Sequence, residues 1–411
     1  MIMRYPGWCV LVFMAGSAWA GSPDALDLAD LPGDTPAAVR DWNAFVEGAA
    51  QRWQPVDGGA ARQGQRLSVD LNVDHAFAPE WRAVFADRLD IDWRNRLSGD
   101  SEVNTLKELY VSNAPQSDEV FDLGRINVRN GVASGYNPTD LFRRDALRSV
   151  VSPDPDSLRD NRLGTVMLRA QRLWDRGSLT AIVAPRLTDA PSDNAWSPDL
   201  GATNRQTRWQ LAATRQFAPG LSPQWLLSGG DGESPQAGAN LTGVVNDATV
   251  VYLEWSGGRS GALTDPDAQG FHSRLASGAT YTFPDKLSLT AEYEYNGAAP
   301  DRNGWNALRN GSPVQYGQYR ELTADRQDLP TRDALFLYAS WQDCAMLHLD
   351  LTLLEHVDLV DHSRLTWLEA RYHWSRVDLA LQWQLNSGAA NSDFGAAPQR
   401  RVAQIVMRGY L

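Results

Sequence analysis

The chain has 411 residues, a formal net charge of −12 and a hydrophobic fraction of 43%. This acidic balance argues against a nucleic-acid partner, because proteins that bind nucleic acid present basic patches to the phosphates. The mean hydropathy is −0.40, and no apolar run after residue 20 approaches the roughly 18 residues of a membrane-spanning helix. These features exclude a helical membrane protein.

Residues 1–20 predict a secretory signal peptide. Arg4 lies in a short basic start, an apolar stretch follows, and Ala18-Trp19-Ala20 precedes Gly21 with the small residues that signal peptidase accepts. We expect residues 21–41, rich in Pro, Asp and Ala, to form a periplasmic N-terminal tail, and residues 42–411 to form one domain. Cys344 then has no partner for an internal disulfide.

Apolar and polar residues alternate in segment after segment. Leu287, Leu289 and Ala291, for example, interleave with Ser288, Thr290 and Glu292. Period two over eight or more residues predicts half-buried strands. We expect strands near 42–54, 64–76, 80–96, 103–113, 118–128, 161–174, 177–188, 204–217, 221–231, 236–246, 248–259, 270–284, 286–298, 331–343, 346–358, 362–374, 377–388 and 401–411.

A transmembrane barrel reconciles this pattern with the polar composition. Its strands need only about 9–11 residues, and only alternate residues face lipid. We therefore predict an all-β fold, a transmembrane antiparallel up-and-down β-barrel of about 18 strands. Sixteen strands is the alternative, because 42–54 and 236–246 are the faintest segments. Alternation alone also fits a soluble antiparallel sheet.

The connections between the predicted strands alternate in length. Tight ones include 77–79, 175–177, 284–286 and 375–376, and longer or polar ones fall at 55–63, 129–160, 189–203, 259–269, 299–330 and 389–400. Outer-membrane barrels have short periplasmic turns and longer outer loops. Aromatic residues near the strand ends, including Trp53, Trp81, Trp174 and Trp374, fit the interfacial girdles of such barrels.

Arginine dominates the predicted lumen. Lys107 and Lys286 are the lysines, so Arg supplies 36 of the 38 basic residues. These side chains either form a structural lining of salt bridges or a mixed-charge constriction that selects solutes by sign and size. The candidate pore-lining or constriction residues are Arg88, Arg125, Arg129, Asp140, Arg143, Arg144, Arg148, Arg162, Arg169, Glu292 and Glu294.

The segment 122–148 is the most distinctive part of the chain. Gly131 and Gly135 allow unusual backbone dihedrals, and Pro138 ends the extended stretch. We expect Thr139 or Asp140 to cap a short helix that runs to Arg148. A loop of about 30 residues is typically functional, so it either folds into the lumen as a charged gate or packs on its neighbours as an ordered outer loop.

The same segment resembles a known family. Leu123-Gly124-Arg125, the glycine-bearing stretch, Asn137-Pro138-Thr139-Asp140 and the segment 160–187 are similar to the alginate-export-type barrels and their relatives in the outer membrane of Gram-negative bacteria. The likeness covers about a sixth of the chain. It implies a monomeric 18-stranded barrel that passes a solute or polymer through an Arg/Asp-lined pore.

The sequence gives little support to an enzyme. Six histidines lie on separate predicted strands, and only His356 and His362 share a hairpin with Asp358 and Asp361. A hydrolytic site needs His with Ser or Asp converging at one rim. We expect no catalytic residues, no metal site and no cofactor.

The C-terminal segment 401–411 resembles the closing strand of a bacterial outer-membrane barrel. Ala403, Ile405 and Met407 share one face, and Leu411 stands where that family usually has Phe. The resemblance implies a location in the outer membrane, lipid contacts, insertion by the barrel-assembly machinery and no nucleic-acid partner. We expect a passive pore or export channel. The alternatives are a secreted soluble all-β carbohydrate-binding or hydrolytic protein, and a barrel acting as anchor or adhesin.

Overall fold

The computed structural model describes residues 40–93, 102–192 and 194–411, and within them it contains 18 strands. The predicted signal peptide and nearly all of the predicted tail lie outside these residues. The strands are β1 (Trp42–Pro55), β2 (Arg62–Ala78), β3 (Trp81–Asp92), β4 (Glu102–Gln116), β5 (Glu119–Ile126), β6 (Thr165–Trp174), β7 (Gly177–Ala184), β8 (Arg208–Arg215), β9 (Gln224–Gly230), β10 (Glu233–Asn246), β11 (Thr249–Ala262), β12 (Asp265–Thr282), β13 (Leu287–Asn296), β14 (Asp333–Trp341), β15 (Leu349–Asp358), β16 (Arg364–His373), β17 (Val377–Ser387) and β18 (Gln399–Tyr410).

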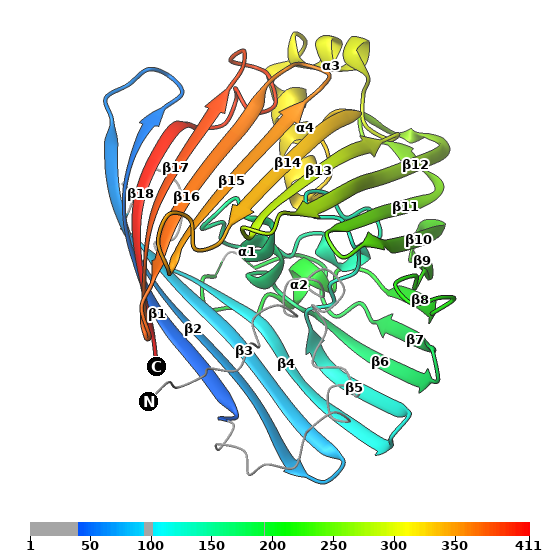
Figure 1. The fold of residues 1–411 in the computed structure, drawn as a ribbon. Coiled ribbons are helices and arrows are strands. Elements are labelled where there is room, and N and C mark those ends of the chain that lie inside the picture. The colour runs from blue at the N-terminus through cyan, green and yellow to red at the C-terminus, as the bar shows by residue number, and fades with distance from the viewer. Residues whose placement is uncertain (1–39, 94–101, 193) are drawn as a thin grey trace, which may run out of the picture.

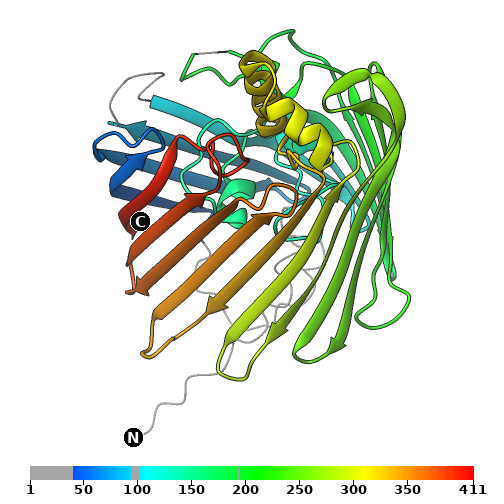
Figure 2. The ribbon, with the colours of Figure 1, turned by 90° about the horizontal axis from the view of Figure 1, so that it is seen from above.

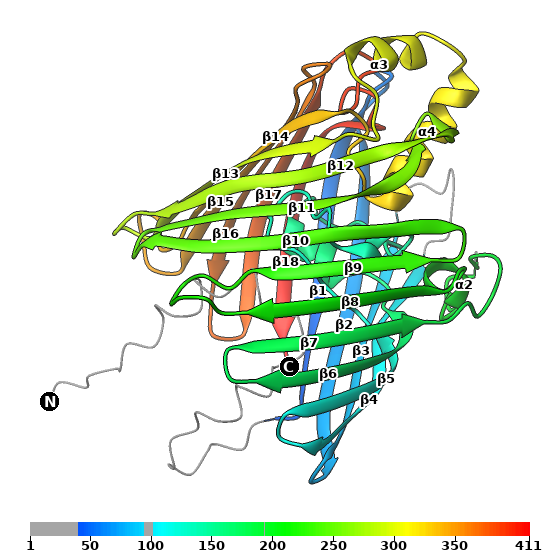
Figure 3. The same ribbon diagram turned by 90° about the vertical axis from the view of Figure 1, so that its right-hand side faces the viewer.

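These strands close into one antiparallel barrel (Figure 1). Each strand pairs with the next in sequence, and β1 pairs with β18 from Phe45↔Tyr410 to Pro55↔Gln399. The view in Figure 2 shows the ring, and Figure 3 shows the strong tilt of the strands. The prediction of an 18-stranded up-and-down barrel is confirmed, and the alternative of sixteen strands is wrong.

Alternation sorts the side chains between the two faces of the wall. In β18, Val402, Gln404 and Val406 are buried inside, whereas Ala403, Ile405 and Met407 are exposed outside. Similar rows of exposed Leu and Val run around the outer surface of the strands. Soluble monomers rarely expose apolar patches of this extent, so the outer surface is suited to hydrocarbon.

Aromatic pairs gather where the strands meet the short turns. Phe77 and Trp81 lie with ring centroids 6.3 Å apart, and Tyr372 and Trp374 with centroids 4.6 Å apart. Trp174 is also exposed at this end. The girdle expected from the sequence therefore exists here, but Trp53 is not part of it. Trp53 is 7% exposed, because its position on β1 turns it into the barrel.

The connections alternate between short turns at one end of the barrel and longer loops at the other, as predicted, with one correction. The long connections 127–164 and 297–332 leave the same end of the barrel, where the second one carries α3 (Arg302–Arg309) and α4 (Pro313–Arg326). The segment 259–269, expected to be a polar loop, is instead almost entirely strand. β11 and β12 continue pairing to Ala262↔Asp265, with a shift of register between Gly261 and Ala262.

None of the helices in the described parts of the chain is long and apolar enough to cross a membrane.

The sidedness of the wall gives a first test. Leu381 is 55% exposed on the outer face of β17, and Leu381→Arg places a charge in hydrocarbon at a cost of about 2–4 kcal/mol. We expect a marked loss of folded barrel, measured by heat-modifiable gel migration. Gln384→Arg on the inner face of the same strand serves as the control, and equal losses for both would contradict the assignment of the two faces.

Candidate functional site: the lumen and its inserted loop

The connection between β5 and β6, residues 127–164, folds back into the barrel. Figure 2 shows its helix α1 (Pro155–Asp160) inside the ring of strands. A short 3-10 helix, Leu141–Arg143, precedes α1 in the same connection. We call residues 127–164 the lumen loop.

Two wall carboxylates hold the main chain of this loop. Glu254 on β11 accepts hydrogen bonds from the backbone N–H of Val132 (2.9 Å) and Thr139 (2.8 Å). Glu292 on β13 accepts from the N–H of Ser134 (2.8 Å) and Tyr136 (3.0 Å). Charge-assisted bonds of this kind are about twice as strong as neutral ones, so the tip of the loop is fixed against the wall.

The glycines expected to be special explain how the loop approaches so closely. Gly131 has φ +104°, and a Cβ there would lie 2.6 Å from Oε2 of Glu254. A Cβ on Gly135 would lie 2.3 Å from Oε1 of Glu294. A larger residue at either position would push the main chain away from the carboxylates that bind it.

Apolar contacts complete the attachment. Phe142 and Val128 pack with Val84, Tyr110 and Met167 of the wall. At the tip, Ala133 and Tyr136 pack with residues of β11, β12 and β14. The lumen loop is therefore a packed part of the barrel core, with wall contacts along most of its length.

The helix predicted from Thr139 or Asp140 to Arg148 is wrong. Thr139 donates its hydroxyl to Glu254 at 2.8 Å, and Asp140 forms an ion pair with Arg162 at 2.8 Å. Neither side chain is free to cap a helix, and Asp145 adopts φ +58°. Only the single turn Leu141–Arg143 remains helical.

The outer loop 297–332 is tied to the lumen loop through Asp328. Its carboxylate accepts from Arg143 (2.6 Å) and from the hydroxyl of Tyr136 (3.1 Å). Burial disfavours the charged form of Asp328, but Arg274 and Arg143 outweigh this and lower its pKa. For Tyr136, burial and the charge of Asp328 raise the pKa of the phenol.

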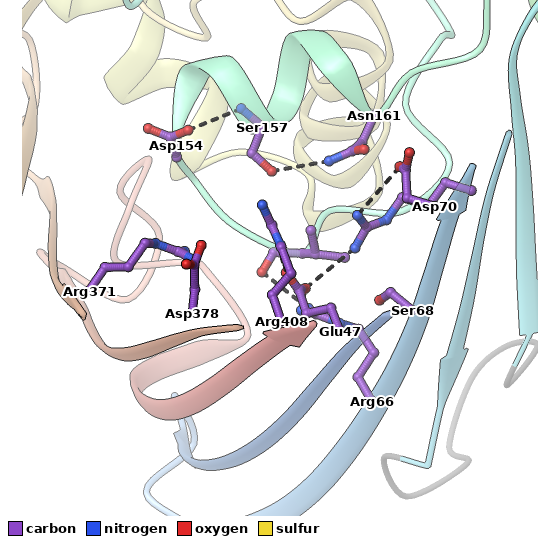
Figure 4. A network of polar contacts seen from close by, with 12 residues as sticks. Glu47, Arg66, Ser68, Asp70, Asp154, Ser157, Asn161, Arg371, Asp378 and Arg408 are labelled. Atoms are coloured by element: carbon purple, nitrogen blue, oxygen red, sulfur yellow. Dashed lines mark hydrogen bonds and ion pairs between the residues drawn. The ribbon is translucent and has the colours of Figure 1, made fainter. Parts of the chain in front are cut away.

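The wall opposite the tip of the lumen loop carries a network of arginines and carboxylates (Figure 4). Glu47 accepts from Arg66 at 2.5 Å and from Arg408 at 2.7 Å. Lys107 donates to Asp70 at 2.8 Å. These side chains come from β1, β2, β4 and β18, and antiparallel pairing places their inward faces side by side. The carboxylates neutralise the charge of the buried guanidinium groups and accept their hydrogen bonds. The arginine side chains therefore remain at the surface of the lumen.

Across from this wall, α1 presents acidic residues. Asp154 caps the helix by accepting from the N–H of Ser157 at 3.0 Å, and its other oxygen accepts from the hydroxyl of Tyr338 at 3.2 Å. Burial and the charge of Asp156 raise the pKa of Asp154 to about 6. Asp156 itself has a raised pKa, because it is buried and lies near Asp160.

A cavity of about 440 Å³ lies between this wall of paired arginines and carboxylates and the acidic helix α1. It shares Arg66 and Gln382 with a smaller cavity of about 170 Å³ toward the outer loops. It shares Asn72 and Glu108 with a vestibule of about 870 Å³ that reaches the N-terminal end of β1. The three cavities lie in sequence along one side of the barrel.

The structure distributes the eleven candidate pore residues over several roles. Arg88 and Arg129 line the central cavity, and Arg169, bonded to Asp122 at 2.7 Å, lines the vestibule. The remaining eight lie elsewhere. Arg125 is buried on β5, and Asp140 and Arg162 are buried within the lumen loop, where they pair with each other. The other five are bound as follows: Arg143 to Asp328, Arg144 to Glu233, Arg148 to the backbone carbonyls of 104, 194 and 197, Glu292 to the loop tip and Glu294 to His356.

Several lining residues were not selected from the sequence. Asp154 and Asp156 lie on a helix whose start was readable, because Asp followed by Pro is a typical N-cap and first-turn pair. Glu369 and Arg371 form a bidentate pair with both bonds at 2.9 Å. Their alternation on β16 gives the inward face, but only the path of the lumen loop decides which inward residues remain accessible.

The histidine hairpin does not assemble a joint site. His356 bonds to Glu294 at 2.8 Å, whereas His362 lies 3.1 Å from Arg302. Among the described residues, no three His, Cys, Asp or Glu side chains are arranged to hold a metal ion.

Comparison with solved structures identifies the architecture. The chain is similar to OccAB1 of Acinetobacter baumannii, with 11% identity, a TM-score of 0.55 and coverage of 90% of this chain and 96% of that one. It is also similar to a BenF-like porin from Pseudomonas fluorescens Pf-5, with 9% identity, a TM-score of 0.58 and coverage of 90% and 98%. The fold is that of a porin barrel. OccK5 (OpdH) of Pseudomonas aeruginosa matches at 8% identity with a TM-score of 0.53, over 90% and 98% of the two chains.

No protein-family model matches the sequence, and no curated protein is similar enough in sequence to match.

The grip on the lumen loop is testable. We expect Glu254→Ala combined with Glu292→Ala to release the loop tip. Eight hydrogen bonds from backbone and side-chain groups of the lumen loop end on these two carboxylates, and the double variant removes all of them. Single-channel conductance in planar bilayers should change severalfold and become noisier. Glu355→Ala, which removes a carboxylate bonded to Thr366 instead, is the control, and an unaltered conductance in the double variant would contradict the role.

Proposed function

We propose that the protein is a passive pore of a Gram-negative outer membrane for small hydrophilic, charged solutes. The observation that carries the proposal is the chain of cavities through a closed barrel whose outer surface is apolar. Barrels of 16–18 strands leave an aqueous channel. The lumen loop narrows this one to a passage along β1–β4 and β14–β18.

The electrostatics of the central cavity give the proposed selectivity. The wall contributes Arg66, Arg88 and Arg408 together with carboxylates such as Glu47, whereas helix α1 contributes only acidic charges to the lining, from Asp154, Asp156 and Asp160. Opposite charges across a narrow passage orient a solute that carries both signs. Charged rings in pores select by sign in the same way. We infer that the passage discriminates by the arrangement of charges as well as by size.

Export of a polymer, as in the alginate-export-type barrels, is the second candidate. It rests on the Asn137-Pro138-Thr139-Asp140 motif. In this barrel Thr139 binds Glu254 and Asp140 binds Arg162, so the motif accounts for the attachment of the loop and contributes little about the transported molecule. The fixed loop and the 440 Å³ cavity favour small solutes.

Conductance tests the proposed function directly. Purified refolded protein should form discrete ohmic channels in planar lipid bilayers, and heat-unfolded protein should form none. Partition of polyethylene glycols of increasing size should give a sharp cut-off if the loop sets the narrowest point. A folded, membrane-inserted barrel without conductance would overturn the pore and leave an anchor or adhesin role.

The raised pKa of Asp154 predicts pH-dependent selectivity. Asp154 is mostly ionised at pH 7.5 and mostly neutral at pH 5, because its pKa is about 6. Cation preference should therefore fall as the pH drops through 6, by about twofold for one charge in a partly screened passage. Reversal potentials in a KCl gradient measure this ratio.

Asp154→Asn separates the charge from the fold. Asn also caps helices well, so α1 should keep its start at Pro155 and its cap bond from the N–H of Ser157. At pH 7.5 the variant should show the lower cation preference that the unmodified protein reaches near pH 5. An identical pH profile for both proteins would contradict the role of Asp154.

A further inference from the structure

The outer wall of the barrel carries a furrow where its first and last strands meet. Its volume is about 650 Å³, and Ala50, Arg52, Trp93, Ala403 and Ile405 are among the residues that line it. At the seam Ala50 of β1 pairs with Ile405 of β18, and Ala403 of β18 pairs with Arg52 of β1, so the short alanine side chains leave space between the larger ones. Leu381 and Ile405 line one side of the furrow, and Trp93 lines the other side.

Two arginines face outward at the outer-loop end of this furrow. Arg52 pairs with Ala403 and Gln54 pairs with Arg401, so Arg52 and Arg401 are diagonal neighbours on the outer face. Such neighbours lie about 7–8 Å apart. Both are exposed. Arg62 and Arg400, at the adjoining strand ends, are exposed as well.

These four arginines lie at adjoining strand ends of a chain whose net charge is −12. Many arginines that face the lumen pair with carboxylates, as Arg66 does with Glu47. Within the described parts of the chain, neither Arg52 nor Arg401 has a salt bridge or side-chain hydrogen bond in the structure. Asp57 in the adjoining loop does not pair with these arginines. Its carboxylate accepts a hydrogen bond from the N–H of Gly59 at 2.9 Å.

We propose that this site binds a phosphorylated lipid of the outer leaflet. One acyl chain lies in the furrow between Leu381, Ile405 and Trp93, and a phosphate is held by Arg52 and Arg401. Guanidinium groups bind phosphate oxygens bidentately. Arg52 is part of the furrow lining, and Arg401 is the diagonal neighbour of Arg52 on the same outer face. Charge complementarity therefore selects an anionic headgroup at the level where the hydrocarbon ends.

A second copy of the chain fits this surface less well. A twofold interface brings the same patch of both subunits together. Arg52 and Arg401 would then face the same arginines of the other copy without an acidic partner. The furrows of the two copies would also face each other and leave an unfilled space between them. The lipid satisfies the positive charge and fills the hollow at the same time.

Lipid binding can be measured on the purified barrel in neutral detergent. The probe is diphosphoryl lipid A, compared with its dephosphorylated form and with inorganic phosphate alone, and native mass spectrometry reports the bound fraction. We expect Arg52→Ala combined with Arg401→Ala to weaken binding of the diphosphoryl lipid at least tenfold. Dephosphorylated lipid should bind weakly to both proteins.

The matched control is Arg172→Ala with Arg215→Ala, which removes two exposed arginines from the opposite rim. Its affinity should be unchanged. Equal losses in both double variants, or equal affinity for dephosphorylated lipid, would overturn the site, and binding of inorganic phosphate alone at similar affinity would overturn the role of the furrow. A change from oligomer to monomer in Arg52→Ala/Arg401→Ala without any loss of lipid would assign the surface to a second copy and overturn the proposal.

The lipid-binding experiment can fail or succeed independently of the proposed pore function. Arg52 and Arg401 face away from the lumen, so conductance should be unchanged in the variant. Heat-modifiable migration confirms that both double variants fold.

Discussion

The closure of the sheet governs everything else in this molecule. A spanning strand has no water to satisfy its N–H and C=O groups, so each must pair with a neighbour. The pairing of β1 with β18 completes the ring over eleven residue pairs. Once the ring is closed, alternation alone assigns every strand residue to hydrocarbon or to the lumen. The polar composition of the chain and its apolar outer surface are consequences of that single constraint.

Inside the ring, a different interaction decides the shape of the passage. Backbone N–H groups of the lumen loop point at Glu254 and Glu292, which are fully buried. Carboxylates in such a position are costly unless they are paired, and the loop supplies that pairing. The loop and the wall therefore stabilise each other. Removing either leaves buried charge or unsatisfied main chain.

The sequence predicted the barrel well because its signals are local. Each of the 18 strands was placed within a few residues, since period two and tight turns are visible in short windows. The lumen was predicted less well because its side chains depend on contacts far apart in the chain. Arg162 binds Asp140 within the lumen loop, and no local pattern distinguishes it from Arg66 at the cavity. The start of α1 at Asp154-Pro155 is a local signal within the site, because Asp before Pro is typical of a helix N-terminus.

The position of the lumen loop divides the circumference unequally. Its anchors lie on the middle strands, at Glu254 of β11 and Glu292 of β13, whereas the central cavity opens against the first and last strands. The middle strands therefore hold the lumen loop, and the first and last strands line the passage. Substitutions on the middle strands can change the diameter and charge of the passage indirectly, by moving the loop, whereas substitutions on the first and last strands change direct contacts with the solute. The permeability of this barrel can consequently diverge between relatives that keep the same number of strands.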